Sequence, residues 1–216
     1  MGVQQNQTQF LLRRLQSLTG IFPVGGYLCF HLFENLAALS GPERFNEIVH
    51  DIEKLAPLPY FYIIEWSLIL IPLLIHSLLG MMIWFSGQPN PLAYPYRRNW
   101  LYTLQRWTGG IGFLFILSHF LQWRWAVLMR GTPITYADIT RDLAGVPMLT
   151  WYLVGVLSLC FHFGNGLYGF CYSWGITVGK KSQRMMEYVG WGAFVATSIV
   201  AVNILVSLHL AGVAHG

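Results

Sequence analysis

Long apolar runs, separated by short polar segments, dominate this chain. Five runs are long enough to cross a membrane as helices, because a hydrocarbon core of about 30 Å needs about 20 helical residues. The predicted spans cover residues 19–39, 60–85, 107–128, 147–172 and 188–210. Short connections and the absence of a sequence repeat predict one domain over residues 1–216. The predicted fold class is an all-α integral membrane protein, a five-transmembrane-helix up-and-down bundle.

The polar segment after the first predicted span has a helical pattern of its own. Between residues 42 and 55, apolar residues recur at helical spacing while polar residues take the other side. The apolar residues are Phe45, Ile48, Val49, Ile52 and Leu55. This pattern predicts a short amphipathic helix that lies on the outer membrane surface.

Composition supports the membrane class, since 55% of the 216 residues are hydrophobic and 10% are charged. Soluble domains carry about 25% charged residues. The net charge of +4 is small and reflects basic loops, so we expect no nucleic-acid partner. With the N-terminus inside, eight basic residues face the cytoplasm, which favours that orientation. They are Arg13, Arg14, Arg97, Arg98, Arg106, Lys180, Lys181 and Arg184, against Arg44, Lys54, Arg124, Arg130 and Arg141 outside.

Four of the seven histidines lie deep in the predicted spans, one in each of the first four. A titratable side chain within lipid is costly and therefore points to a function. By position along the spans, His31 and His119 lie at one height nearer the outside, and His76 and His162 at another nearer the inside. Two facing histidines at one height suit a bis-histidine haem iron. The pattern predicts two haems stacked across the membrane.

The histidines are also compatible with several alternatives to a dihaem protein. Zinc or copper sites need three or four converging ligands, and here there are pairs. A haem-free membrane anchor or transporter could use the histidines as polar pivots between helices. A cytochrome b subunit of a hydrogenase or formate dehydrogenase would also bind two haems through histidines. A respiratory cytochrome b fits less well, because it requires paired histidines on the same helices.

Haem propionates require cationic or hydrogen-bonding partners near the membrane interface. The candidates for the inner haem are Arg14, Ser17, Gln105, Arg106 and Lys180. Arg124 and Arg130 are candidates for the outer haem. Each of the long basic residues also fits an ordinary interface position, where the stem lies along apolar surface and the charge reaches water.

Three stretches of sequence resemble a known family. They are Arg13-Arg14-Leu15-Gln16-Ser17-Leu18-Thr19-Gly20 before His31, Gln105-Arg106-Trp107-Thr108-Gly109-Gly110 before His119, and His162-Phe163-Gly164-Asn165-Gly166 with Trp174 and Gly175. With five spans and one histidine in each of the first four, the chain resembles the dihaem cytochrome b anchor of succinate dehydrogenases and fumarate reductases. In that family, the axial histidine pairs join helix one with helix three and helix two with helix four. The heights of the histidines in this chain indicate the same pairing. Gln16 departs from the family, which often has histidine there; that residue is not an axial ligand.

The resemblance implies a subunit of the bacterial inner membrane that anchors a flavoprotein and an iron–sulfur subunit on the cytoplasmic face. Electrons would pass between the iron–sulfur clusters, two haem b groups and a quinone, with menaquinone expected. The dicarboxylate chemistry would belong to the flavoprotein. The physiological direction and the possible dimerisation of the whole complex stay open.

Quinone reduction takes two electrons and two protons, so the site needs a group that handles protons. The resemblance implies a position near the outer haem, where the carboxylates are Glu34, Asp51, Glu53 and Glu65. Glu53 is the first candidate, because it lies near the end of the amphipathic helix where a quinone head could enter. Glu65 is the second, one turn into the second span. A solvated loop carboxylate is the alternative for Glu53.

Overall fold

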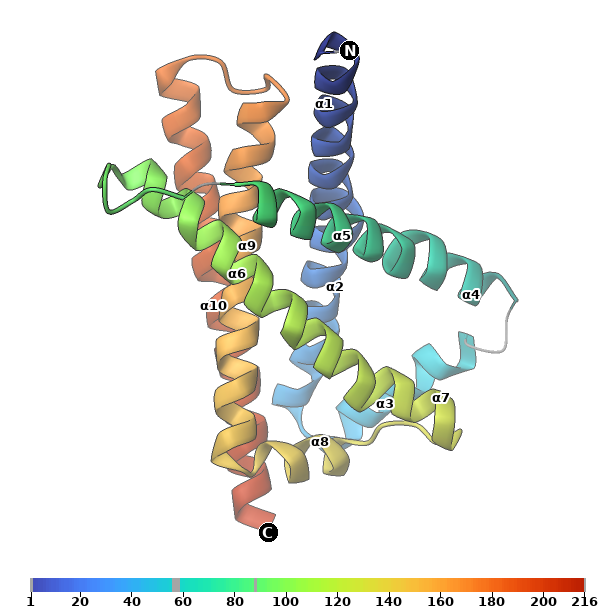
Figure 1. The fold of residues 1–216 in the computed structure, drawn as a ribbon. Coiled ribbons are helices and arrows are strands. Elements are labelled where there is room, and N and C mark those ends of the chain that lie inside the picture. Colours follow the sequence, from blue (N-terminus) through green and yellow to red (C-terminus); the bar gives the residue numbers. More distant parts are fainter. Residues whose placement is uncertain (1, 56–58, 88, 216) are drawn as a thin grey trace.

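The computed structural model describes residues 2–55, 59–87 and 89–215, and every regular element in them is helical (Figure 1). In order these are α1 (Gly2–Thr19), η1 (Gly20–Gly25), α2 (Gly26–Asn35), η2 (Leu36–Ser40), α3 (Pro42–Leu55), α4 (Pro59–Ile64), η3 (Glu65–Leu70), α5 (Ile71–Ser86), α6 (Arg97–His119), η4 (Phe120–Trp125), α7 (Ala126–Arg130), α8 (Tyr136–Leu143), α9 (Val146–Ser173) and α10 (Lys180–His215).

Several of these elements continue one another as single rods. The five rods are α1–η1–α2, α4–η3–α5, α6–η4–α7, α9 and α10, and they alternate in direction. The second and third rods lie obliquely across the other three (Figure 1). The N-terminus and the connections α5–α6 and α9–α10 lie at one end, here called the N-terminal side. The helices α3 and α8 and the C-terminus lie at the other end, the C-terminal side. The bundle class predicted from the sequence is confirmed.

Four helices of the described residues are long and apolar enough to cross a membrane. They cover Tyr60–Ser86, Arg97–Arg130, Val146–Ser173 and Lys180–Ala214. The predicted span 19–39 is helical throughout but is not one of these four, because its apolar stretch is interrupted by polar residues and glycines. The chain is therefore a multi-pass membrane protein, and a fifth crossing stays a prediction.

Three rods contain a π-helical segment: η1, η3 and η4. Pro23 lies inside η1, and Pro72 follows η3 by two residues. Proline has no backbone N–H and its ring crowds the preceding turn, so a wider turn relieves the misfit. No proline lies in η4, whose residues are mostly bulky. Such segments concentrate at functional sites, and these three flank the candidate site described below.

A close helix contact joins α9 and α10. A Cβ atom on Gly164 would lie 2.5 Å from the carbonyl oxygen of Gly190, so glycine is needed at this crossing. Small residues let helices approach closely within a membrane. This contact makes α9 and α10 a fixed pair against which α6 packs.

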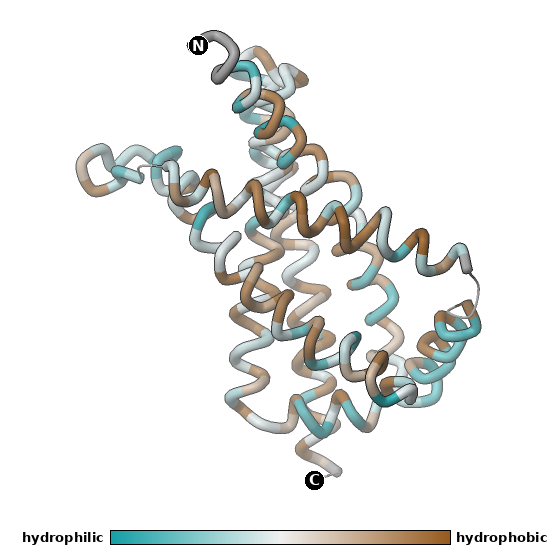
Figure 2. Tube along the Cα trace, turned by 45° about the vertical axis from the view of Figure 1, so that its right-hand side comes forward, coloured by the Kyte–Doolittle hydropathy of each residue, from teal (hydrophilic) through white to brown (hydrophobic). Residues whose placement is uncertain are grey.

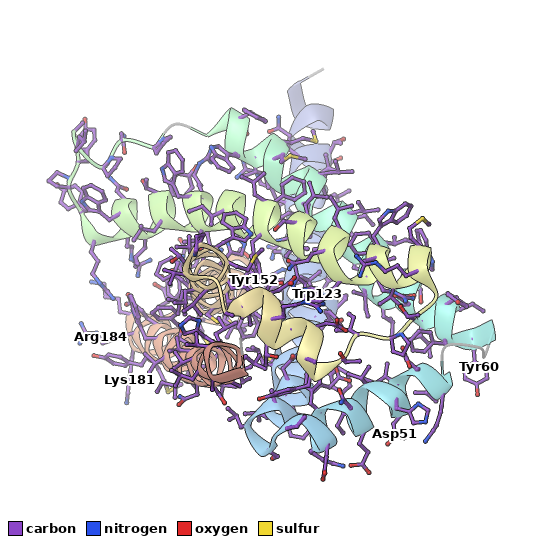
Figure 3. All side chains as sticks on the ribbon, turned by 90° about the horizontal axis from the view of Figure 1, so that it is seen from below. Asp51, Tyr60, Trp123, Tyr152, Lys181 and Arg184 are labelled. Carbon is purple, nitrogen blue, oxygen red and sulfur yellow. The ribbon has the colours of Figure 1, made fainter. Side chains whose placement is uncertain are left out.

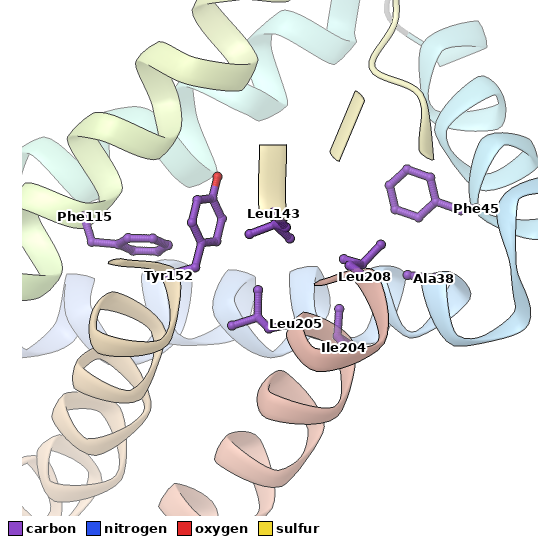
Figure 4. Packing of buried hydrophobic residues seen from close by; sticks show 8 residues of the cluster. All are labelled: Ala38, Phe45, Phe115, Leu143, Tyr152, Ile204, Leu205 and Leu208. Carbon is purple, nitrogen blue, oxygen red and sulfur yellow. The ribbon is translucent and has the colours of Figure 1, made fainter. Parts of the chain in front are cut away.

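A small core lies on the C-terminal side, where α3, α8, α9 and α10 meet (Figure 4). It contains Ala38, Phe45, Phe115, Leu143, Tyr152, Ile204, Leu205 and Leu208. Apolar residues line the α4–η3–α5 rod, whereas α3 carries many polar ones (Figure 2). The helix α3 forms where the amphipathic pattern predicts one, and Phe45 attaches its apolar side to the core. Its position on a membrane surface stays a prediction.

Candidate haem sites

Two pairs of histidine rings face each other between helices. The rings of His76 in α5 and His162 in α9 have centroids 6.0 Å apart and planes at 85°. Those of His31 in α2 and His119 at the end of α6 have centroids 5.9 Å apart and planes at 72°. Metal–imidazole bonds are about 2 Å long, so in each pair one ion could bind a ring nitrogen from both sides. These are the two pairs that the residue heights predicted.

The donor set of each pair suits a haem iron better than a free metal ion. In the described part of the chain, no group of three or more histidine, cysteine or acidic side chains could hold a metal. Two axial nitrogens are enough where a porphyrin supplies the remaining ligands. The residues therefore fit haem, although the axial role of each histidine stays a prediction.

Backbone carbonyls orient the rings of the His76–His162 pair. The Nδ1 atom of His76 lies 2.8 Å from the carbonyl oxygen of Gln16, and Nδ1 of His162 lies 3.0 Å from that of Gln105. A carbonyl oxygen only accepts, so each Nδ1 must donate and each neutral ring keeps Nε2 unprotonated. This tautomer, assigned from the hydrogen bonds, is the one that a haem ligand with a hydrogen-bonded outer nitrogen adopts.

Side chains surround the His31–His119 pair instead. Tyr152 Oη lies 3.3 Å from Nδ1 of His119. The amide nitrogen of Asn35 lies 3.5 and 3.4 Å from the two ring nitrogens of His31 and donates to the His31 carbonyl oxygen at 2.7 Å. A carboxylate oxygen of Glu34 lies 4.0 Å from Nδ1 of His31. Sequence reasoning gave Asn35 and Tyr152 no role, because their contacts depend on how the helices are rotated.

Two glycines leave room for the rings of the first pair. A Cβ atom on Gly20 would overlap the imidazole of His76, and one on Gly109 would lie 2.8 Å from Cε1 of His162. Both glycines lie on the helix that faces the ring, close to the carbonyl that accepts from it. Each imidazole therefore packs directly on a neighbouring backbone, which only glycine permits.

Arg14 has the features expected of a residue that binds a propionate. Its guanidinium lies over the rings of Phe10 and Trp174, each 4.8 Å from the centroid. Its Nη1 is buried and has no hydrogen-bond partner among the described residues. A buried donor without a partner is costly, and an anionic carboxylate would satisfy it. Ser17, one turn on, accepts a hydrogen bond from Nε1 of Trp174 at 3.0 Å and so lies beside Arg14.

The remaining inner candidates have protein partners or lie in the open. The amide of Gln105 donates to the carbonyl oxygen of His162 at 3.0 Å and accepts from Asn165 at 2.8 Å. Arg106 donates to the carbonyl oxygen of Ile83 at 3.0 Å, and Lys180 is exposed at the start of α10. Gln105 thus ties α6 to α9 next to a candidate ligand.

On the C-terminal side, Glu65 pairs with Arg124 through two hydrogen bonds. The Nε–Oε1 and Nη2–Oε2 distances are 2.6 and 2.7 Å, and the pair joins η3 to η4. A bidentate pair of this kind is strong and directional. Arg124, proposed from sequence as a partner of the outer propionates, therefore has a carboxylate partner, while Arg130 is exposed at the end of α7.

The carboxylates of Asp51 and Glu53 lie on α3 and are less enclosed. Asp51 is exposed, and the hydrogen bond from Lys54 at 2.8 Å lowers the pKa of its carboxyl. A lowered pKa makes Asp51 a poor proton acceptor near neutral pH. Glu53 is half-buried on the same helix, which packs mainly on η2 and α8.

Two facing histidine pairs in a helical membrane protein are typical of membrane-bound b-type cytochromes. Residues 94–202 match the family of succinate dehydrogenase/fumarate reductase transmembrane subunits. The chain is 42% identical over 195 residues to the succinate dehydrogenase cytochrome b558 subunit of Bacillus subtilis (strain 168), a match that covers 90% of this chain and 95% of that relative. This chain belongs to the succinate dehydrogenase/fumarate reductase transmembrane subunit family. It is a membrane-anchor cytochrome b subunit, as the sequence motifs indicated.

Proposed function

We propose that this subunit links an iron–sulfur protein to membrane quinone by means of two b haems, one held by His31 and His119 and one by His76 and His162. The observation that carries the proposal is that both histidine pairs predicted from sequence lie within 6.0 Å, ring to ring. When bound, each haem would act as a one-electron carrier. A flavoprotein subunit, bound through the iron–sulfur protein, would perform the dicarboxylate chemistry.

The chain's own residues orient the cofactors in this proposal. Gln16 and Gln105 accept the outer protons of His76 and His162 through their carbonyls, so both rings present Nε2. Arg14, whose buried Nη1 has no hydrogen-bond partner among the described residues, would supply a cation on the same side of the molecule. That side would be cytoplasmic, in a bacterial inner membrane, because it carries the larger number of basic residues.

The first experiment is a redox-difference spectrum of the purified membrane complex with a haem assay per chain. We expect two b-type haems per chain that titrate at separate potentials and are reduced by succinate. One haem would make one histidine pair structural. No haem would contradict the electron-transfer function and favour a haem-free anchor.

For the quinone, we propose a site on the C-terminal side that uses Glu65 or Glu53 as the proton-handling group, with menaquinone as the expected substrate. Burial favours Glu65, whose side chain is 15% exposed and lies in a π-helical segment. The test compares Glu65→Gln and Glu53→Gln in the assembled complex. The residue that serves the quinone should show slowed quinone reduction, with haem content and succinate reduction of an artificial dye unchanged. Quinone reduction at the unmodified rate in both variants would exclude the two carboxylates.

A further inference from the structure

A chain of hydrogen bonds runs from His119 to a carboxylate on the C-terminal side. Nδ1 of His119 lies 3.3 Å from Tyr152 Oη, which also receives a 2.5 Å hydrogen bond from Nε1 of Trp123. The hydroxyl of Tyr152 donates to Oε1 of Gln122 at 3.0 Å, and Nε2 of Gln122 donates to Oδ2 of Asp142 at 2.9 Å. Figure 3, which views the molecule from this side, shows Tyr152 and Trp123 close together.

The donor and acceptor capacities of these groups leave one consistent arrangement. The carboxylate of Asp142 only accepts, so Gln122 must turn its amide nitrogen to Asp142 and its oxygen to Tyr152. Tyr152 has one proton, which goes to that oxygen, and its two lone pairs then accept from Trp123 and from His119. Nδ1 of His119 must therefore carry a proton, and in the neutral ring Nε2 is unprotonated.

We propose that Asp142, Gln122 and Tyr152 form a directed hydrogen-bond relay that fixes the tautomer of His119 and tunes the haem that His119 binds. Tyr152 is a positioning residue, since it acts through His119. It is 6% exposed, so water does not replace its hydroxyl as the partner of the ring. The inference rests on the proposed haem ligation by His119.

The relay predicts the direction of a potential shift. An acceptor on Nδ1 makes an axial imidazole a stronger ligand, and loss of such an outer partner typically weakens metal binding about 10–100-fold. A stronger imidazole favours ferric over ferrous iron. Removing the acceptor should lower the ratio of ferric to ferrous affinity about tenfold, which raises a one-electron potential by about 59 mV.

The experiment titrates both haems in the assembled complex for Tyr152→Phe, Gln122→Met and the double variant, with haem content and the low-temperature EPR signals as further readouts. Ser118→Ala is the matched control. Ser118 accepts from Nε1 of Trp151 at 3.0 Å and so also joins α6 to α9, next to His119 but outside the relay.

We expect Tyr152→Phe and Gln122→Met each to raise the potential and change the EPR signal of one haem only, the one lost in His119→Ala. Adding Gln122→Met to Tyr152→Phe should cause no further shift, because both act through the same hydroxyl. Ser118→Ala should leave both potentials unchanged.

The relay would be wrong if Tyr152→Phe left both haems unchanged, if Gln122→Met acted equally with and without Tyr152, or if Ser118→Ala gave the same shift. Failure of the proposed function would look different. In that case the unmodified complex would contain no haem, or His119→Ala would leave both haems in place.

Discussion

The two histidine pairs are similar in ring spacing but differ in how their outer nitrogens are held. The His76–His162 pair donates to two backbone carbonyls, from Gln16 and Gln105. In the His31–His119 pair, the neighbours are the side chains of Asn35 and Tyr152. Substituting a side chain leaves a carbonyl in place, whereas it can remove a hydroxyl outright. The first pair is therefore fixed by the fold, and the second depends on individual residues.

This difference suits the positions of the two pairs. Under the proposed function, the His76–His162 pair would receive electrons from the iron–sulfur partner, and its backbone acceptors would keep its environment constant. The His31–His119 pair lies beside Glu34, and His119 directly precedes η4, the segment that carries Arg124 of the Glu65–Arg124 ion pair. Side-chain control there would let single substitutions adjust a haem that serves the quinone.

The largest expected effect comes from removing a candidate ligand. His162→Ala should abolish the haem of the His76–His162 pair and leave the other, while His119→Ala should do the reverse. Haem content per chain, with a redox titration of each variant, measures this. If His31→Ala and His76→Ala removed the same spectral component, the pairing would be wrong.

Filling the space beside a ring tests whether the first pair depends on its backbone contact. In Gly20→Ala, the added methyl group would overlap the ring of His76, so we expect loss or displacement of that haem alone. Gly26→Ala is the control on the same rod, since a Cβ there meets nothing within 4 Å. The measurement is the haem content of Gly20→Ala compared with that of Gly26→Ala. Equal haem content would mean that His76 can move away from the added methyl group without loss of its haem.

Breaking the Glu65–Arg124 ion pair should lower the stability of the protein more than breaking an exposed ion pair on the N-terminal side. In Arg124→Leu, the enclosed side chain of Glu65 loses its ion-pair partner, and removing one partner of a buried pair costs about 3–5 kcal/mol. The double variant with Glu65→Leu should recover most of this loss. The comparison is Arg97→Gln on the N-terminal side. Arg97 pairs with Glu187 but is 62% exposed, so the expected loss of unfolding free energy is below about 1 kcal/mol. Thermal unfolding of the purified complex measures all three, and equal losses would contradict the asymmetry.

The smallest effect concerns α8, which carries Asp142. Thr135 and Asp138 form a capping box at its start, so Thr135→Ala should cost about 1 kcal/mol. Hydrogen bonds from Thr135 lower the pKa of Asp138. The stabilisation from this carboxylate is thus complete above its unfolded pKa of about 3.9, and it is lost as the pH falls through the lower folded value. Unfolding between pH 3 and 7 measures this, and Asp138→Asn should flatten the acid limb.

Most helices, and which histidine rings face each other, could be predicted from sequence, because the apolar runs mark these helices and counting residues along them gives the height of His31, His76, His119 and His162. The rotation of each helix about its own axis could not be predicted by counting residues. The contact of Tyr152 with His119 depends on that rotation. So does the ion pair of Glu65 with Arg124, whose two residues were each predicted to serve a different group.

Some helices also extend beyond the ends of the apolar runs. α1 begins at Gly2 and α10 at Lys180, outside the apolar runs, because helical hydrogen bonding continues through polar residues beyond the apolar core. The apolar runs contain no pattern that predicts the π-helical segments. Pro23 and Pro72 were the available signals, and η4 has no such marker.

The segment η1 has a consequence for how the first rod can change in length. Gln16 and Gly20, which meet His76, precede or begin η1, and His31 follows it. Each residue turns a helix by about 100°, and a π turn absorbs one extra residue. Deleting one residue within Gly20–Gly25 would restore α-helical winding and leave the direction of His31 relative to Gln16 nearly unchanged, whereas deleting one residue from the α-helical stretch between Gly26 and His31 would turn His31 away by about that angle. η1 is therefore the part of the rod that can lose one residue without turning one candidate haem site relative to the other, and single-residue gaps among relatives should fall within it.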